Sequence, residues 1–305
     1  MTAPGTVLEF NDIARSYKKG TPVIDGVTFA MKQGEVLALL GRNAAGKTTL
    51  LNLAMGMLFP HRGSVHVFGM SPTDEPVAVK RRLGYVSENQ VLPQMARISE
   101  IIAFHQHLYA KWDGSLEREL LKRFGLDDTN RRISQLSHGQ ARQVALLCAV
   151  CHHPELLIMD EPAGGLDPAA RREFLETSIQ LLNREGTSIL FSSHHMGDVE
   201  RLGGRVILLD GGRVRVDSDL DALRENYCLA VVPQHSLTHL DDLRKLSGCL
   251  GARALTNDWH AVFMGTPAEV RARILTALGV NAHCTLVPLE ELFVELVGGD
   301  RTVGV

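Results

Sequence analysis

One short segment limits what this chain can fold into more than any other. Residues 41–49 fit G-x-x-x-x-G-K-[ST], the phosphate-binding loop. The apolar run 36–40 predicts a buried strand entering the loop, and residues 50–55 predict a helix leaving it. A glycine-rich turn that matched the motif by chance would not be expected to have both the strand before it and the helix after it. The predicted nucleotide-binding residues of the loop are Gly41, Arg42, Asn43, Ala44, Ala45, Gly46, Lys47, Thr48 and Thr49.

The chemistry of such a loop follows from its backbone and two side chains. Its N–H groups and the N-terminus of the next helix bind the phosphates of a nucleotide. Lys47 is expected to bridge the β- and γ-phosphates and to take part in catalysis, and Thr48 is expected to ligate Mg²⁺. ATP and Mg²⁺ are therefore the predicted cofactors.

Two carboxylates follow a second apolar run, residues 156–159. A strand there, beside the strand of the phosphate loop, would place Asp160 near Mg²⁺. Glu161, one residue further on, would polarise the attacking water as a general base. An acidic pair alone arises easily by chance. A strand ending in such a pair, downstream of a phosphate loop, indicates nucleotide hydrolysis.

Residues 136–140 read Leu-Ser-His-Gly-Gln and resemble the signature sequence of ABC-type ATPases, which is usually Leu-Ser-Gly-Gly-Gln. The pentapeptide precedes the Asp160 strand, as it does in that family, and the resemblance covers about residues 7–217. It implies that Tyr17 stacks on adenine and that His194 is the catalytic switch histidine. It also implies a head-to-tail dimer of cassettes. The remaining nucleotide contacts implied are Ser137, Gly139, Gln140 and Asp167.

The chain departs from the family pattern at three positions. Ala44 stands where glycine is commoner, which suggests that this position does not need a positive φ. His138 replaces a signature glycine. Glu88 stands where the family has a glutamine that ligates Mg²⁺, and its carboxylate is expected to do the same. If the loop shifts, Asn89 or Gln90 would serve instead. The Glu88 substitution resembles one in a branch of bacterial exporter-type cassettes.

Composition and charge restrict the partners and the compartment. The chain has 305 residues and a net charge of −3, which is not the basic balance typical of nucleic-acid binding, so no nucleic-acid partner is expected. No apolar stretch approaches 18 residues, and no secretory signal is visible. We therefore expect a cytoplasmic protein whose five cysteines are reduced thiols.

Residues 148–152 match C-x-x-C-H, the attachment motif of c-type haem. No second C-x-x-C completes a zinc site. Cys148 and Cys151 are one helical turn apart in an apolar segment, and buried cysteine behaves as a small hydrophobic residue. The motif is therefore interpreted as part of a buried helix.

The chain is predicted to contain two domains. Residues 1–218 are an α/β, ABC-type P-loop ATPase core, with an antiparallel β subdomain and a helical subdomain at about 89–150. Strands at 7–10, 27–30 and 65–68 form the antiparallel sheet. Residues 219–305 are a small α+β module with the order βαββαβ, a ferredoxin-like pattern. Its helix at 267–278 is marked by a capping box at Thr266. Such a module more often packs or dimerises than binds a ligand.

The resemblance implies the ATP-hydrolysing subunit of a membrane transporter, an exporter, at the cytoplasmic face of the membrane. A second cassette and a multi-span membrane subunit are the expected partners. The membrane subunit would dock near Glu88, where the core meets the helical subdomain. One alternative is a soluble ABC-type ATPase acting on DNA or ribosomes, but the chain has one phosphate loop and no sustained heptads. The other is a non-catalytic subunit of a mixed dimer, against which Glu161 and His194 argue.

Overall fold

The computed structural model describes residues 5–18, 21–88, 92–236, 239–298 and 303–304. The chain divides into two compact units, Met1–Val214 and Arg215–Val305. The division falls inside strand β9 (Arg213–Asp219). The first unit contains every predicted site residue, so its layers decide which of these residues can meet.

The centre of the first unit is a mainly parallel sheet. Among the described residues of this unit its strand order is β9-β8-β3-β7-β6-β5, and only the start of β9 belongs to the unit. The bounds are β3 (Val36–Leu40), β5 (Leu83–Val86), β6 (Leu156–Met159), β7 (Ser188–Ser193) and β8 (Arg205–Asp210). Strand β14 (Val303–Gly304) belongs to the second unit, where it pairs with Val216 and Asp217 of β9. Strand β3 pairs in parallel with β7 and β8, and β6 pairs in parallel with β5 and β7. The predicted parallel α/β core is confirmed.

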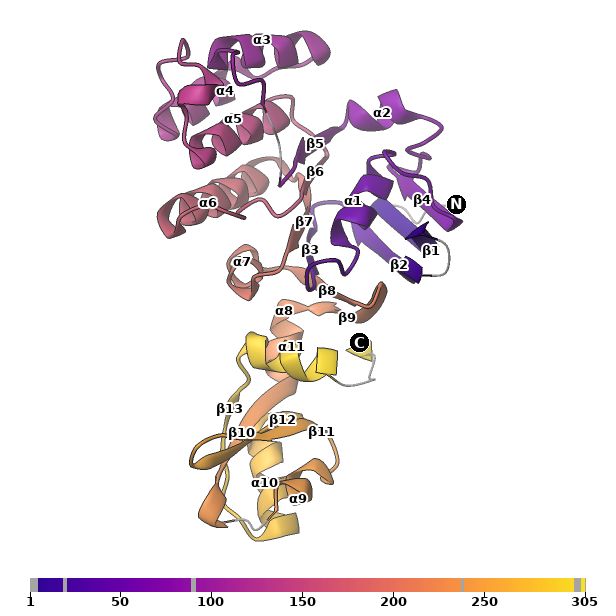
Figure 1. The fold of residues 1–305 in the computed structure, drawn as a ribbon, viewed down its shortest axis with the longest axis vertical. Coiled ribbons are helices and arrows are strands. Elements are labelled where there is room, and N and C mark those ends of the chain that lie inside the picture. The colour runs from indigo at the N-terminus through magenta and orange to yellow at the C-terminus, as the bar shows by residue number, and fades with distance from the viewer. Residues whose placement is uncertain (1–4, 19–20, 89–91, 237–238, 299–302, 305) are drawn as a thin grey trace. The chain divides into compact units, whose positions relative to one another are not determined.

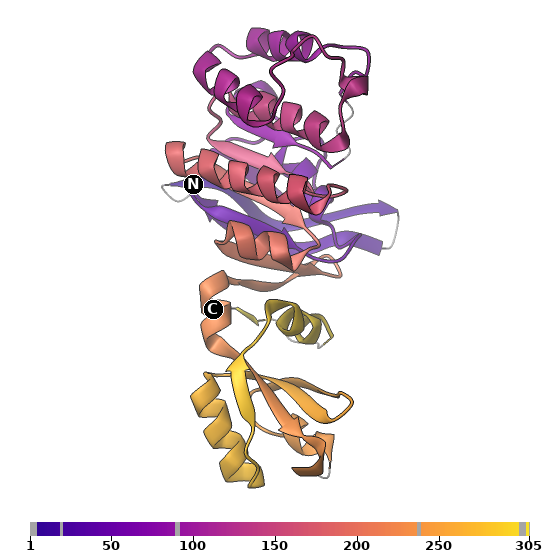
Figure 2. The same ribbon diagram turned by 90° about the vertical axis from the view of Figure 1, so that its left-hand side faces the viewer.

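Burial explains why these strands are continuous apolar runs. All of β6 and β7 is buried, as expected for a parallel sheet covered on both faces. Helices α6 (Pro168–Glu185) and α7 (Met196–Leu202) lie across one face (Figure 2). Because β3, β6 and β7 run in parallel, the segments that follow them meet at one edge of the sheet.

A three-stranded antiparallel sheet of order β2-β1-β4 forms the second layer. Its strands are β1 (Thr6–Lys18), β2 (Thr21–Lys32) and β4 (Arg62–Val67), each longer than predicted but overlapping the predicted segment. Helix α1 (Lys47–Ala54) lies between the two sheets and shares one core with them (Figure 1). Phe10 and Phe29 pack in that core with ring centroids 4.8 Å apart.

The segment between Glu88 and Val150 is largely helical within its described part, 92–150. It contains α3 (Ile98–Leu108), α4 (Gly114–Arg123), a 3₁₀ turn (Ile133–Gln135) and α5 (His138–Val150), and the short α2 (Pro76–Lys80) precedes it. These three helices lie together, apart from the antiparallel sheet (Figure 1). Asp113 caps α4 by accepting from the N–H groups of Ser115 at 2.8 Å and Leu116 at 3.0 Å.

The C-x-x-C-H segment forms the buried end of α5. Cys148 and Cys151 are buried free thiols, and burial raises the pKa of Cys148 to about 12. His152 stacks on Tyr109 at 3.8 Å, and its Nε2 lies 3.0 Å from the carbonyl oxygen of Leu83. Burial lowers the pKa of His152 to about 4, so its ring is neutral at pH 7. These residues pack the helical segment onto the core.

The second unit is an α+β module. Its strands are β10 (Tyr227–Pro233), β11 (Cys249–Ala254), β12 (Asp258–Met264) and β13 (His283–Leu286), in the antiparallel order β11-β12-β10-β13. Its helices are α8 (Leu220–Asn226), α9 (Leu240–Arg244), α10 (Pro267–Leu278) and α11 (Leu289–Gly298), with a 3₁₀ turn at Gln234–Ser236. From β10 to β13 the order is the ferredoxin-like βαββαβ. Thr266 caps α10 through the predicted capping box, with Pro267 at the first turn.

Candidate nucleotide-binding site

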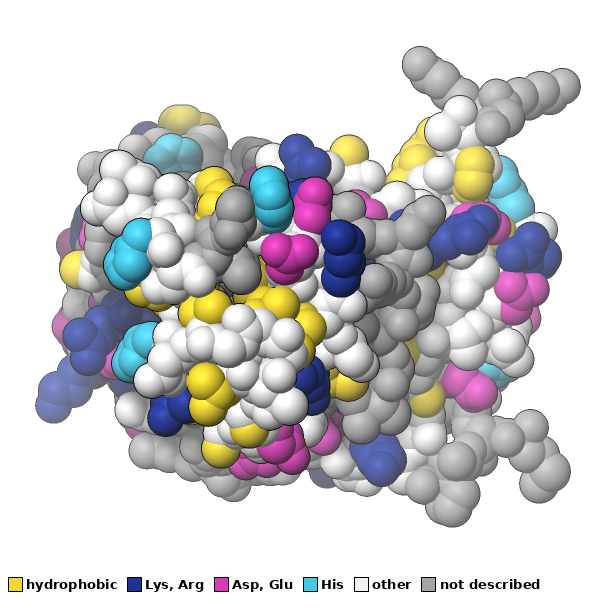
Figure 3. Space-filling view, turned by 90° about the horizontal axis from the view of Figure 1, so that it is seen from below, with side chains coloured by type: hydrophobic (Ala, Val, Ile, Leu, Met, Phe, Trp, Pro, Cys, Tyr) yellow, Lys and Arg dark blue, Asp and Glu magenta, His cyan; other side chains and the backbone are white. Residues whose placement is uncertain are grey.

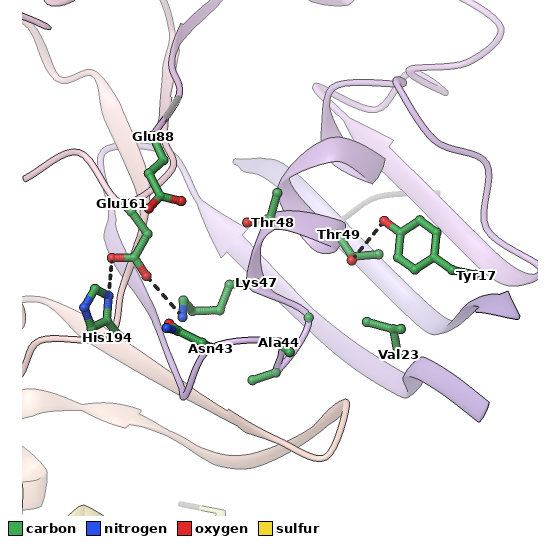
Figure 4. Close-up of a pocket in the computed structure, with 12 residues that line it drawn as sticks. Tyr17, Val23, Asn43, Ala44, Lys47, Thr48, Thr49, Glu88, Glu161 and His194 are labelled. Carbon is green, nitrogen blue, oxygen red and sulfur yellow. Dashed lines mark hydrogen bonds and ion pairs between the residues drawn. The ribbon is translucent and has the colours of Figure 1, made fainter. Parts of the chain in front are cut away.

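A cavity of about 450 Å³ opens where the segments after β3, β6 and β7 meet. The phosphate loop follows β3, Glu161 follows β6, and His194 follows β7. Glu88, Glu161 and His194 lie opposite the loop residues Lys47 and Thr48, with Tyr17 beyond Thr49 (Figure 4). The lining residues are Tyr17, Val23, Asn43, Ala44, Ala45, Gly46, Lys47, Thr48, Thr49, Glu88, Glu161 and His194.

Lys47 is held at the bottom of this cavity. Its Nζ donates to the carbonyl oxygens of Gly41 at 2.7 Å and Arg42 at 3.4 Å, and lies 3.1 Å from Glu161 Oε1. The lysine is 6% exposed, so its charge is balanced by these oxygens more than by water. Gly46 allows the close fit of the loop, because a Cβ there would lie 2.2 Å from Cδ1 of Ile24.

The expectation for Ala44 was wrong. Ala44 has φ 66, so this position of the loop does adopt the left-handed conformation that favours glycine. A residue with a Cβ loses roughly 1–2 kcal/mol in that conformation. Ala44 is exposed and its methyl group is the smallest side chain after glycine's hydrogen. The loop therefore keeps its turn at the cost of local strain.

Glu161 joins the two sides of the cavity. Its Oε1 pairs with Lys47, and its Oε2 accepts a hydrogen bond from Nδ1 of His194 at 2.8 Å. Its backbone is left-handed, with φ 44, and its N–H donates to Oγ of Ser192 at 2.8 Å. The same Ser192 hydroxyl donates to Oδ1 of Asp160 at 2.6 Å. The structure thus brings the three predicted catalytic residues together, around a carboxylate able to accept a proton.

The three predicted Mg²⁺ ligands differ in position. Thr48 and Glu88 line the cavity, whereas Asp160 is 3% exposed and is not among the lining residues. Hydroxyl and carboxylate oxygens are the donors that Mg²⁺ prefers, so the residues present fit this ion. Asn89 and Gln90, the alternative ligands, lie outside the described residues.

Tyr17 stands at the far end of the cavity, where it is 58% exposed. Its hydroxyl lies 3.2 Å from Oγ1 of Thr49, and the guanidinium of Arg15 lies 5.7 Å from its ring centroid. The exposed ring at the edge of the cavity fits the prediction that Tyr17 stacks on adenine. Val23 also lines the cavity but was not predicted, because an apolar residue in a strand carries no signal that separates it from the core.

The signature residues lie outside the cavity. Ser137 Oγ accepts from the N–H of Gln140 at 3.1 Å, and Gln140 Oε1 accepts from the N–H of Ser137 at 3.2 Å. A Cβ at Gly139 would lie 3.4 Å from Ala170, which follows Asp167. Asp167 itself accepts from the N–H groups of Ala169 and Ala170. The signature and the Asp167 loop are therefore neighbours, and neither lines the cavity that the phosphate loop lines.

A phosphate loop, a carboxylate pair and a histidine in contact with one of the carboxylates, at one edge of a parallel sheet, define a P-loop ATPase. Comparison with known proteins gives the family. Residues 24–164 match the family model described as ABC transporter. The linearmycin resistance ATP-binding protein LnrL of Bacillus subtilis is 30% identical over 313 residues, covering 96% of this chain and 98% of that protein. This chain belongs to the ABC transporter family as an ATP-binding subunit.

Other relatives agree. The ABC transporter ATP-binding protein NatA of Bacillus subtilis is 33% identical, covering 72% of this chain and 92% of NatA. The Nod factor export ATP-binding protein I of Rhizobium etli is 30% identical over 96% of this chain and 94% of its own length. A solved ATP-binding subunit of an ABC transporter superposes with a TM-score of 0.65 at 31% identity, covering 72% of this chain and 92% of that one. The chain is thus an ATPase subunit that powers transport.

Proposed function

We propose that this chain hydrolyses ATP in the cavity that Lys47 and Glu161 line, and that it drives an exporter. The contact that carries the proposal is the bridge from Lys47 through Glu161 to His194. It supports the proposal because it brings an ammonium, a carboxylate and an imidazole together at one cavity.

Each residue has a distinct part in the reaction. Lys47 neutralises the negative charge that builds up on the phosphates as the γ-phosphoryl group is transferred to water. Glu161 takes a proton from the attacking water, and the hydrogen bond from His194 orients its carboxylate. Mg²⁺, when held by Thr48, Glu88 and Asp160, would supply charge neutralisation at the phosphates. Nucleotide phosphates would compete with Glu161 for Lys47, because the two side chains form an ion pair at 3.1 Å.

The proposed partners follow from the position of the signature, which does not reach the nucleotide cavity of its own chain. Ser137 and Gly139 lie outside the cavity that holds the phosphate loop. A second cassette, docked head to tail, would bring its own signature against the nucleotide, and hydrolysis would reopen that dimer. The export direction is supported by relatives named for Nod factor export and for linearmycin and daunorubicin resistance.

The membrane subunit would dock where the core meets the helical subdomain. A second cavity of about 170 Å³ lies there, and residues of both the core and the helical subdomain line it. Met55 at the end of α1 and His105 on α3 both contribute to it. Large apolar side chains are exposed on α3, at Phe104 and Leu108, and in the segment that follows α1, at Met57 and Phe59. Within the described ranges, none of the helices is long and apolar enough to cross a membrane. The exposed apolar side chains support association with the cytoplasmic face of the membrane through this surface.

Replacing Phe104 and Leu108 together by aspartate should release the chain from membranes of the producing cell while leaving ATP binding intact. Two charges would be buried against an apolar partner surface, which is strongly unfavourable. Leu275→Asp is the control, since Leu275 is 51% exposed, against 61% for Phe104 and 54% for Leu108, but lies on α10 of the second unit. Membrane fractionation measures the effect. Equal membrane association of the double variant and the control would contradict the docking surface.

The soluble DNA- or ribosome-acting alternative has less support. The full-length relatives are named as resistance and export ATP-binding proteins. On the face shown in Figure 3, the Lys and Arg side chains of the described residues are scattered among acidic and histidine side chains. A continuous basic surface, typical of nucleic-acid binding, is therefore not seen on that face.

Glu88→Ala should raise the Mg²⁺ concentration needed for half-maximal ATPase activity, and Glu88→Gln should change it only modestly. The glutamine amide keeps an oxygen that can ligate Mg²⁺ and removes one negative charge, whereas alanine removes the ligand oxygen. A Mg²⁺ titration at saturating ATP measures the difference, with Glu176→Gln as an exposed control. If Glu88→Ala matches the wild type while Gln90→Ala does not, the ligand is Gln90.

A further inference from the structure

Arg142 makes an unusual set of contacts that the site described so far does not use. It lies one turn into α5, directly after the signature. Its Nη1 donates to the carbonyl oxygens of Gly164 at 2.6 Å and Pro162 at 2.9 Å, and lies 3.4 Å from that of Glu161. Its Nη2 donates to the carbonyl oxygen of Glu88 at 2.5 Å. One guanidinium therefore ties two distant segments of the site to the signature helix.

The chemistry of arginine suits this position. A guanidinium is planar and presents five N–H donors in a fixed fork, so it can reach carbonyl groups in different directions at once. The side chain is half-buried, and burial lowers the pKa of Arg142 while the Glu88 carboxylate raises it. A lysine ammonium at the same point would be a compact charge on a flexible stem, which cannot reproduce the fork.

The contact with Glu161 has a particular consequence. Glu161 is a non-glycine residue at φ 44, and such a conformation persists only where several surrounding contacts hold it. The N–H of Glu161 donates a hydrogen bond to Oγ of Ser192 at 2.8 Å. On the other side, the Glu161 carbonyl accepts from the N–H of Gly164 at 3.0 Å and lies beside the guanidinium of Arg142. The direction of the Glu161 carboxylate depends on this backbone.

We propose that Arg142 is a positioning residue for ATP hydrolysis. It holds the turn after Glu161 and the backbone of Glu88 in one arrangement, and it fixes both against the helix that begins at the signature. Arg142 is not among the residues that line the nucleotide cavity, so it acts through Glu161 and Glu88. The inference rests on the proposed roles of those two residues.

The test compares Arg142→Ala and Arg142→Lys with the wild type and with Arg172→Ala, using the purified full chain. Arg172 is 67% exposed and pairs with Glu176 on the surface of α6, so its loss controls for the removal of an arginine. For Arg142→Ala we expect kcat to fall about 10- to 100-fold, since small displacements of catalytic groups cost that much. The Kd for a fluorescent ATP analogue should stay within about threefold, because the phosphate loop keeps its contacts.

Two further readouts separate positioning from general damage. The Mg²⁺ concentration for half-maximal activity should rise in Arg142→Ala, because Glu88 loses its backbone anchor. Arg142→Lys should show an intermediate kcat, and it keeps the proposal testable if the alanine variant does not fold. Thermal melting of each variant shows whether the fold is retained.

The proposal is overturned if Arg142→Ala and Arg142→Lys hydrolyse ATP as Arg172→Ala does. It is also overturned if kcat and ATP affinity fall together in a folded Arg142→Lys protein, since that indicates general disruption of the cavity. Glu161→Gln, measured beside them, tests the underlying site. If Glu161→Gln retains the wild-type rate, the assigned base is wrong. If it loses activity while both Arg142 variants do not, only the role of Arg142 is wrong.

Discussion

Glu161→Gln is expected to abolish ATP hydrolysis while ATP binding is retained. The amide keeps the size and shape of the side chain but cannot accept a proton from water, and the loss of a general base costs about 10²–10⁴-fold in rate. Glu161 Oε1 lies 3.1 Å from Lys47 Nζ. The substitution removes this competing anion, so ATP affinity should be equal to or higher than that of the wild type.

A second effect follows from the same change. A carboxylate beside the γ-phosphate repels it, and the neutral amide does not. The variant should therefore accumulate as an ATP-bound dimer, detectable as a doubled mass by light scattering. Glu176→Gln is the control, because Glu176 is a surface residue paired with Arg172. Phosphate release by Glu161→Gln at the rate of this control would contradict the assignment of the base.

Lys47→Ala should remove nucleotide binding itself. The lysine is 6% exposed and supplies the cation that faces the phosphates, so its loss should lower ATP affinity by about 10²-fold or more. It also leaves the buried Glu161 carboxylate without its cation, which adds repulsion against the nucleotide. Titration with a fluorescent ATP analogue measures the loss.

Lys245→Ala serves as the control for Lys47, since Lys245 is exposed on the second unit. Thermal melting shows whether the Lys47 variant remains folded. An unchanged affinity in a folded Lys47→Ala protein would mean that the loop at 41–49 does not hold the phosphates.

The parts of the site that could be predicted from sequence are those with local patterns. The phosphate loop has a fixed spacing, and the strands ending before Asp160 and His194 are short apolar runs. Parallel strands bring the segments that follow them to one edge of the sheet, so Lys47, Glu161 and His194 could be expected to lie close together. The structure has them in contact. The ferredoxin-like order of the second unit was readable for the same reason, since the capping box at Thr266 and alternating strands are local signals.

The parts that could not be predicted depend on contacts between distant segments. Val23 lines the cavity only because β2 passes beside the phosphate loop. The backbone of Ala44 could not be inferred from its side chain, since the loop imposes φ 66 on it. The Arg142 contacts join α5 to residues on either side of it in the chain, and no local pattern marks an arginine whose partners are backbone carbonyls.

The central claim is that Glu161 is the base for hydrolysis of ATP held by Lys47. It is tested most directly by incubating the Glu161→Gln protein with Mg²⁺ and ATP, removing free nucleotide, and identifying the nucleotide released on denaturation. The site described here predicts that intact ATP is recovered from Glu161→Gln and mainly ADP from the wild type. Recovery of ADP from Glu161→Gln in the proportion seen for the wild type would contradict it.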